Sequence, residues 1–202
     1  ALINERSTSP SPLWRTFAEL GLLAMPFSEA VGGLGGDGVD MMLIMQSLGR
    51  GLVPEAYLDG LIIPGMLLAR LGDDAQRDRW LLPLLEGEHQ LALAWHEAAS
   101  RYEINTPTTY AMRSDNGWQL LGRKQVVLNA PNAAALLVTA RLDDDALGLF
   151  IVPSESEGLR RRDYATLDDQ YASDIDIDLT LPSSALLASG ENLCTALDEA
   201  LA

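Results

Sequence analysis

The sequence has 202 residues, 48% hydrophobic and 21% charged, so it encodes a globular protein with one large core or two smaller ones. Its net charge of −15 disfavours nucleic acid and anionic membrane surfaces as partners. Cys194 is the single cysteine, so we expect no disulfide within the chain. No apolar run is long enough to span a membrane, and residues 1–12 lack a signal-peptide pattern. We therefore expect a cytoplasmic protein.

The first part of the chain has apolar residues at helical spacing. Helices are predicted over residues 12–20, 40–48, 58–71 and 73–85. The second has almost no polar face, so we expect it to lie deep in a bundle. Pro64 and Gly65 should break or kink the third. Asp73 and Asp74 should cap the fourth, and Gly87 should end it.

Beyond Leu91 the apolar period changes from helical to alternating, which is typical of strands. Strands are predicted over residues 91–97, 109–113, 118–121, 135–142, 147–152 and 174–181. Asn116-Gly117 predicts a hairpin turn. Residues 191–202 return to helical spacing, and this helix has nothing left to pack on, so we expect an absent domain or partner. The fold class is therefore α+β: an all-α domain (1–88), an antiparallel β-barrel or sandwich (89–190) and the first turns of a C-terminal helical domain (191–202).

The strand at 91–97 ends in Trp95, His96 and Glu97, which indicates polar groups delivered to an edge or cleft. Glu97 could serve as a general base if burial raised its pKa, but pairing with Arg101 or capping a turn is the commoner role. His89 and His96 are too few for a metal site, and we expect none.

Two further patterns invite a ligand hypothesis. Residues 33–38 fit G-x-G-x-x-G, with Glu55 at a distance that suits a ribose carboxylate, but no strand precedes the glycines, so a turn between helices is favoured over a nicotinamide site. Basic residues at 123–124 and 160–162 could receive an anion locally.

The order of several motifs resembles the flavin-dependent acyl-CoA dehydrogenases. The helical part carries WRTFAELGLLA (14–24), GGLGG (32–36), QSLGR (46–50) and LLPLLEG (81–87), which are similar to that family's N-terminal domain. ALAWHE (92–97) and GRKQVVLNA (122–130) resemble the two segments of its middle domain that line the flavin. The resemblance implies FAD as cofactor.

Carried over by position, the resemblance implies flavin contacts from six residues: Leu93, Trp95, His96, Val126, Val127 and Leu128. Tyr102 stands in the region that meets the thioester tail in the family. His96 replaces the usual Thr or Ser, and Arg101-Tyr102-Glu103 replaces the usual Gly-Ser-Asp. Val126 and Leu128 replace the Trp and Thr that pack on the ring and bond to it.

The resemblance implies α,β-dehydrogenation of an acyl-CoA thioester to the 2-enoyl-CoA, with an electron-accepting flavoprotein and further subunits as partners. The family's catalytic glutamate lies in a C-terminal domain, so we expect no catalytic residue in this chain. An alternative is a non-catalytic pairing subunit of a hetero-oligomer with weak or no flavin binding, favoured by Val126 and Leu128. The residues at 97–102 and 168–172 are similar to the small-subunit branch of pimeloyl-CoA dehydrogenase.

Overall fold

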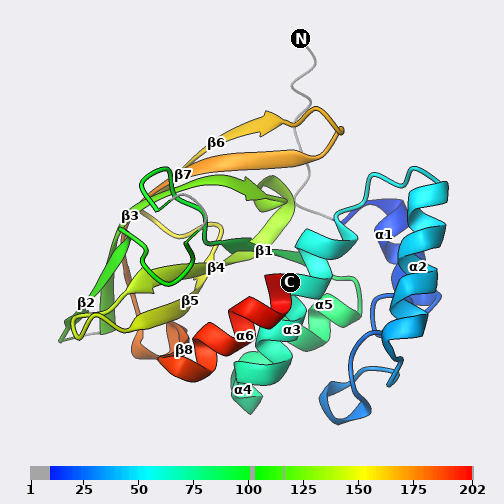
Figure 1. Ribbon diagram of the computed structural model, residues 1–202, viewed down its shortest axis with the longest axis horizontal. Helices are drawn as coiled ribbons and strands as arrows, with labels where there is room; N and C mark the ends of the chain where they lie inside the picture. The colour runs from blue at the N-terminus through cyan, green and yellow to red at the C-terminus, as the bar shows by residue number, and fades with distance from the viewer. Residues whose placement is uncertain (1–9, 101–102, 116, 202) are drawn as a thin grey trace.

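The computed structural model describes residues 10–100, 103–115 and 117–201. A block of helices is followed by a curled sheet, and the last helix returns to the helical side (Figure 1). This arrangement confirms the α+β class. None of the helices in the described part of the chain is both long and apolar enough to cross a membrane.

The helices fall close to the ranges that the sequence predicts. The elements are α1 (Pro12–Glu19), a 3₁₀ turn η1 (Glu29–Val31), α2 (Gly38–Arg50), η2 (Leu58–Ile62), α3 (Ile63–Leu71), α4 (Asp74–Gln76), η3 (Arg77–Leu81) and α5 (Leu82–Leu85). Ser11 caps α1 by accepting the Trp14 N–H, and Asp73 forms a capping box with Gln76 at α4. Gly87 ends the helical block with φ +74°, a conformation that favours glycine.

Pro64 does not break the third predicted helix. The turn just before it, η2, is a π-helix, and α3 continues through Pro64 to Leu71. The same arrangement recurs at Pro83, which follows the π-helix η3. A proline cannot donate a backbone hydrogen bond and its ring clashes with the carbonyl one turn earlier, so the wider turn lets the helix continue.

Helix α2 contradicts one expectation from the sequence. We predicted that its apolar residues would lie deep in a bundle, but none of its residues is buried. It lies at one edge of the helical block (Figure 1). Val39, Met42 and Leu43 are each at least half exposed. The apolar sequence therefore predicted the helix correctly, but the prediction that this helix is buried was wrong.

The second domain contains one sheet of eight strands in the described residues. They are β1 (Gln90–Ala94), β2 (Tyr110–Ser114), β3 (Gly117–Leu128), β4 (Ala133–Arg141), β5 (Leu147–Pro153), β6 (Leu159–Ala165), β7 (Tyr171–Leu181) and β8 (Leu186–Ser189). The hydrogen-bonded order is β6-β7-β3-β2-β4-β5-β8, with β1 beside β4. Most pairs are antiparallel, but β1 and β2 both run parallel to β4, which the sequence did not predict.

Strand β1 separates two hydrophobic cores. Leu91 and Leu93 face the core shared with the helices, whereas Ala92 and Ala94 face the core inside the curled sheet. This alternation follows from the period of two along a strand. The end of β1 is therefore held between the two domains.

Helix α6 (Glu191–Leu201) corrects a second expectation, because it does have a surface to pack on. Leu193 and Leu197 are fully buried in the core that also contains Leu67 and Leu68 of α3. Arg70 of α3 forms an ion pair with Glu199 of α6. The last helix is thus part of the helical side of this molecule (Figure 1).

Candidate functional site

A cavity of about 390 Å³ lies where the end of β1 meets the helices. Its lining residues are Asp59, Ile63, Leu93, Trp95, His96, Val126, Leu128 and Leu201. One wall comes from β1 and β3, and the other from η2, α3 and α6. The volume is in the range of small-molecule and cofactor sites, and the lining is mostly apolar.

A β-bulge in β3 determines which side chains reach this cavity. The register between β3 and β7 shifts between Lys124 and Val127, and Val126 has φ +50°. Val126 is therefore 48% exposed on the cavity side, whereas Val127 is 1% exposed and lies in the core of the sheet. A positive φ is costly for a β-branched residue, and such strain is concentrated at functional sites.

Asp174 of β7 holds the bulge in place. Its carboxylate accepts the Val126 N–H at 3.3 Å and the Tyr164 hydroxyl at 3.2 Å. Arg123 and Arg162 lie 3.9 and 3.7 Å from the same carboxylate. These ion pairs involve two of the basic residues that the sequence indicated as possible anion receivers.

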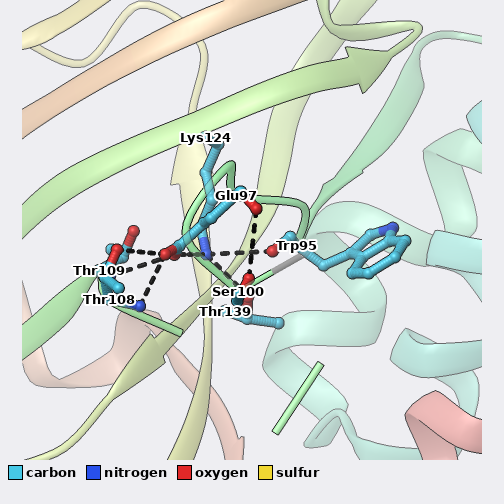
Figure 2. Close-up of polar contacts among 7 residues, drawn as sticks. All are labelled: Trp95, Glu97, Ser100, Thr108, Thr109, Lys124 and Thr139. Atoms are coloured by element: carbon cyan, nitrogen blue, oxygen red, sulfur yellow. Dashed lines mark hydrogen bonds and ion pairs between the residues drawn. The ribbon is translucent and has the colours of Figure 1, made fainter. Parts of the chain in front are cut away.

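Behind the cavity wall, Glu97 and Lys124 form a buried ion pair of 2.6 Å (Figure 2). Glu97 also accepts the N–H groups of Thr108 and Thr109 at 2.6 and 3.1 Å and the Thr108 hydroxyl. Lys124 also donates to the Thr139 hydroxyl at 2.9 Å and is within 3.5 Å of the Trp95 carbonyl. Figure 2 shows the Trp95 ring pointing away from this cluster towards the helices.

The electrostatics of this pair argue against Glu97 as a general base. Burial alone would raise its pKa, but the Lys124 ammonium and the threonine hydrogen bonds outweigh it and lower the pKa to about 2. Burial lowers the pKa of Lys124 to about 8, against the opposing effect of Glu97. A carboxylate so stabilised in its ionised form is a poor proton acceptor at neutral pH. Glu97 instead anchors the segment that ends at Thr109, and its partner is Lys124.

The helical wall of the cavity is positioned by a close approach between η2 and the corner after β3. A Cβ on Gly60 would lie 2.6 Å from Nδ2 of Asn129, so only glycine allows this contact. Asn129 Nδ2 in turn donates to the Leu91 carbonyl at 3.0 Å. Asp59, the residue just before Gly60, lines the cavity.

Five of the six predicted flavin contacts line the same cavity, and only Val127 does not. Their role in cofactor binding stays a prediction. Tyr102 and Arg101 lie outside the described residues. Sequence reasoning missed Asp59, Ile63 and Leu201 as cavity residues. It also missed the pairing of Lys124, although Lys124 shares the even-numbered, inward face of β3 with Trp118 and Leu120.

Three further features of the sequence can be placed in the fold. The glycines at 33–38 connect η1 to α2 with no preceding strand, so no dinucleotide-binding βαβ unit exists there. Among the described residues no cluster of His, Cys, Asp and Glu could hold a metal ion. His89 is structural: Nε2 lies 2.9 Å from the Trp80 carbonyl, and burial lowers its pKa.

A helical domain packed on a curled sheet, with a cavity of ligand size at the junction, defines a two-domain α+β protein with a candidate ligand site. Residues 1–88 match the family described as "Acyl-CoA dehydrogenase, N-terminal domain". Acyl-CoA dehydrogenase FadE12 of Mycobacterium tuberculosis is 27% identical over 191 residues, covering 89% of this chain and 48% of that protein. Benzylmalonyl-CoA dehydrogenase of Aromatoleum aromaticum is 28% identical over 162 residues, covering 79% and 43%.

The structural comparison extends the likeness across both domains. A glutaryl-CoA dehydrogenase from Mycobacterium smegmatis in complex with FADH2 superposes with a TM-score of 0.85 and 26% identity, covering 95% of this chain and 51% of that one. The chain is therefore similar to the acyl-CoA dehydrogenase family: residues 1–88 match the model of its N-terminal domain, and the fold is that of the family's N-terminal helical and middle β domains. It spans about half the length of the relatives it matches.

Proposed function

We propose that this chain provides the flavin-binding part of an acyl-CoA dehydrogenase, with FAD in the cavity at the domain junction. The observation that carries the proposal is that Leu93, Trp95, His96, Val126 and Leu128 converge on one cavity from two segments that are about 30 residues apart in sequence. These are the positions to which the family resemblance assigns flavin contacts.

The residues present fit a flat, largely apolar ring system. Val126 and Leu128 line the cavity from β3, Leu93 lines it from β1, and Trp95 lines it from the segment just after β1. The strained backbone at Val126, held by Asp174, keeps that wall in place without a ligand. His96 is the polar side chain of this wall. Preorganisation of this kind reduces the entropic cost of binding.

Bound flavin would supply hydride acceptance from the β-carbon of an acyl thioester, giving the 2-enoyl product. The protein's own part is to position and to exclude water: the apolar walls hold the ring, and Ile63 on the helical wall covers the space opposite. Glu97 keeps its proton-free, paired state and acts on the shape of the wall. The base that removes the α-proton is proposed to come from outside these 202 residues.

The proposed substrate is an acyl-CoA thioester, and an electron-accepting flavoprotein would reoxidise the cofactor. We also propose assembly with further subunits of this family, as homo- or hetero-oligomer. The relatives that support the first point are named as dehydrogenases of CoA thioesters.

The test is the visible spectrum of the purified chain before and after titration with FAD. We expect close to equimolar binding of a yellow cofactor. Leu128→Lys should weaken FAD binding by about tenfold or more, because it buries a charge against the ring. Met112→Lys is the matched control, since Met112 is also 38% exposed on a strand but lies off the cavity. A chain that stays colourless, or equal effects of the two variants, would contradict the proposal.

A second candidate is a non-catalytic pairing subunit with weak or no flavin binding. Val126 and Leu128 favour it, because neither side chain can donate a hydrogen bond to a flavin. A colourless chain that raises dehydrogenase activity only when mixed with a homologous partner chain would support this candidate over the first.

A further inference from the structure

Asp59 stands out in the cavity because its surroundings are apolar. Of the eight lining residues, Asp59 is the only acid, and His96 is the only other ionisable one. Asp59 shares the helical wall with Ile63 and faces the wall made by β1 and β3. Neither the motifs nor the comparisons give it a role.

The position of Asp59 is fixed by its neighbours. It is the second residue of the π-helix η2; Gly60 after it and Tyr57 two positions before it are buried, whereas Leu58 between Tyr57 and Asp59 is exposed. Gly60 contacts Asn129, and its N–H donates to the Ala56 carbonyl at 2.7 Å. Single π-turns recur at functional sites because they displace a side chain from the regular helical position. The backbone therefore holds the Asp59 carboxylate beside the cavity.

The charges around Asp59 make this part of the cavity negative. Asp168, in the turn between β6 and β7, acts on it electrostatically, and the Gln170 side chain ties that turn to the Pro54 carbonyl at 3.0 Å. Burial first, and then Asp168, raise the pKa of Asp59. None of the ion pairs within the described part of the chain involves Asp59.

We propose that Asp59 is a specificity-determining residue, which makes the cavity accept acyl chains that are uncharged or end in a cation and reject chains that end in a carboxylate. The inference rests on the proposed function, because it assumes that an acyl thioester lies along the helical wall. Like charges close together in a partly buried site repel strongly, whereas opposite charges attract. The substrate class is thus an acyl thioester without a terminal carboxylate.

The experiment uses three thioesters of N-acetylcysteamine with chains of equal length: hexanoyl, adipoyl and ω-aminohexanoyl. They need no CoA-binding surface, and their binding is followed by isothermal titration calorimetry, with and without added FAD. At about pH 8 the terminal carboxyl is ionised and the amine is largely protonated. We expect the adipoyl thioester to bind at least about tenfold more weakly than hexanoyl, and the aminohexanoyl thioester at least as tightly.

Asp59→Asn removes the charge with little change in shape, so the three affinities should converge. Asp78→Asn is the matched control: Asp78 is the second residue of the other π-helix, changes the net charge equally and is exposed away from the cavity. It should leave the discrimination intact. The inference is overturned if the wild-type chain binds the three thioesters equally or not at all, or if Asp59→Asn preserves the differences.

The two proposals fail separately. If FAD does not bind but Asp59 still sets the order of the three thioesters, the flavin proposal fails and the inference stands. If FAD binds with the expected stoichiometry and the order does not depend on Asp59, the inference fails and the flavin proposal stands.

Discussion

Lys124 Nζ lies 2.6 Å from Glu97 Oε1, with neither side chain more than 2% exposed. The pair joins β3 to the residue just after the cavity-lining Trp95 and His96 (Figure 2). Burying two charges is costly, and the cost is offset here because both partners have further hydrogen bonds to threonines. The pair therefore fixes the geometry of the cavity wall. Its loss should lower the free energy of unfolding and change the shape of the cavity.

Lys124→Met removes one partner and leaves a buried, unpaired carboxylate. We expect the free energy of unfolding to fall by about 3–5 kcal/mol. Chemical denaturation followed by circular dichroism measures it. Arg141→Met is the control, because its pair with Asp145 is half exposed and should change stability by less than about 1 kcal/mol. Equal effects of the two variants would refute the structural role of the buried pair.

The low pKa of Glu97 predicts an acid limb in the stability profile. Its pKa is about 2 when folded against 4.5 as the ordinary value, so the folded state favours the ionised form. The resulting stabilisation is present above pH 4.5 and is lost as the pH falls through 4.5 towards 2, by about 3 kcal/mol. Denaturation at a series of pH values measures it. Glu97→Gln should flatten this limb, and an unchanged slope would contradict the prediction.

The strained backbone at Val126 predicts opposite effects of one substitution at adjacent positions. A left-handed conformation costs a residue with a Cβ roughly 1–2 kcal/mol, more than the roughly 0.5–1 kcal/mol that glycine loses in entropy. We expect Val126→Gly to stabilise the protein by up to about 1 kcal/mol. Val127→Gly should instead destabilise it by about 3 kcal/mol, because Val127 is buried. Thermal and chemical denaturation of both variants measure these changes. Equal destabilisation by the two variants would contradict the left-handed conformation of Val126 in the bulge.

The exposure of α2 predicts tolerance to polar residues. Met42 is 59% exposed, so Met42→Gln should change the free energy of unfolding by less than about 0.5 kcal/mol in the isolated chain. Leu68→Ala, in the core between α3 and α6, should cost about 2–5 kcal/mol. Denaturation curves of the two variants measure both changes in the free energy of unfolding. A large loss for Met42→Gln would mean that α2 is buried in solution.

Local sequence patterns were sufficient for most of the elements. Asp73 lies where it predicts a helix start, and the alternation from Asp174 to Leu181 predicts the strand that β7 forms. The strand β6 was not predicted, because its arginine-rich sequence has no alternation of apolar residues. A strand at the exposed edge of a sheet can form without such alternation. Local hydrogen bonding and side-chain periodicity depend on residues a few positions apart, so the sequence contains this information directly.

The site depended on geometry that no local pattern contains. Val126, Val127 and Leu128 look alike in sequence, and only the bulge in β3, set by pairing with β7, turns Val126 and Leu128 towards the cavity and Val127 away. Likewise Glu97 meets Lys124, 27 positions away, and Asp59 reaches the cavity through the contact between Gly60 and Asn129. By itself the sequence determined most of the elements, their order and the family resemblance. The tertiary structure decided which faces and partners they have, because a shift of one residue in strand register reverses every side chain beyond it.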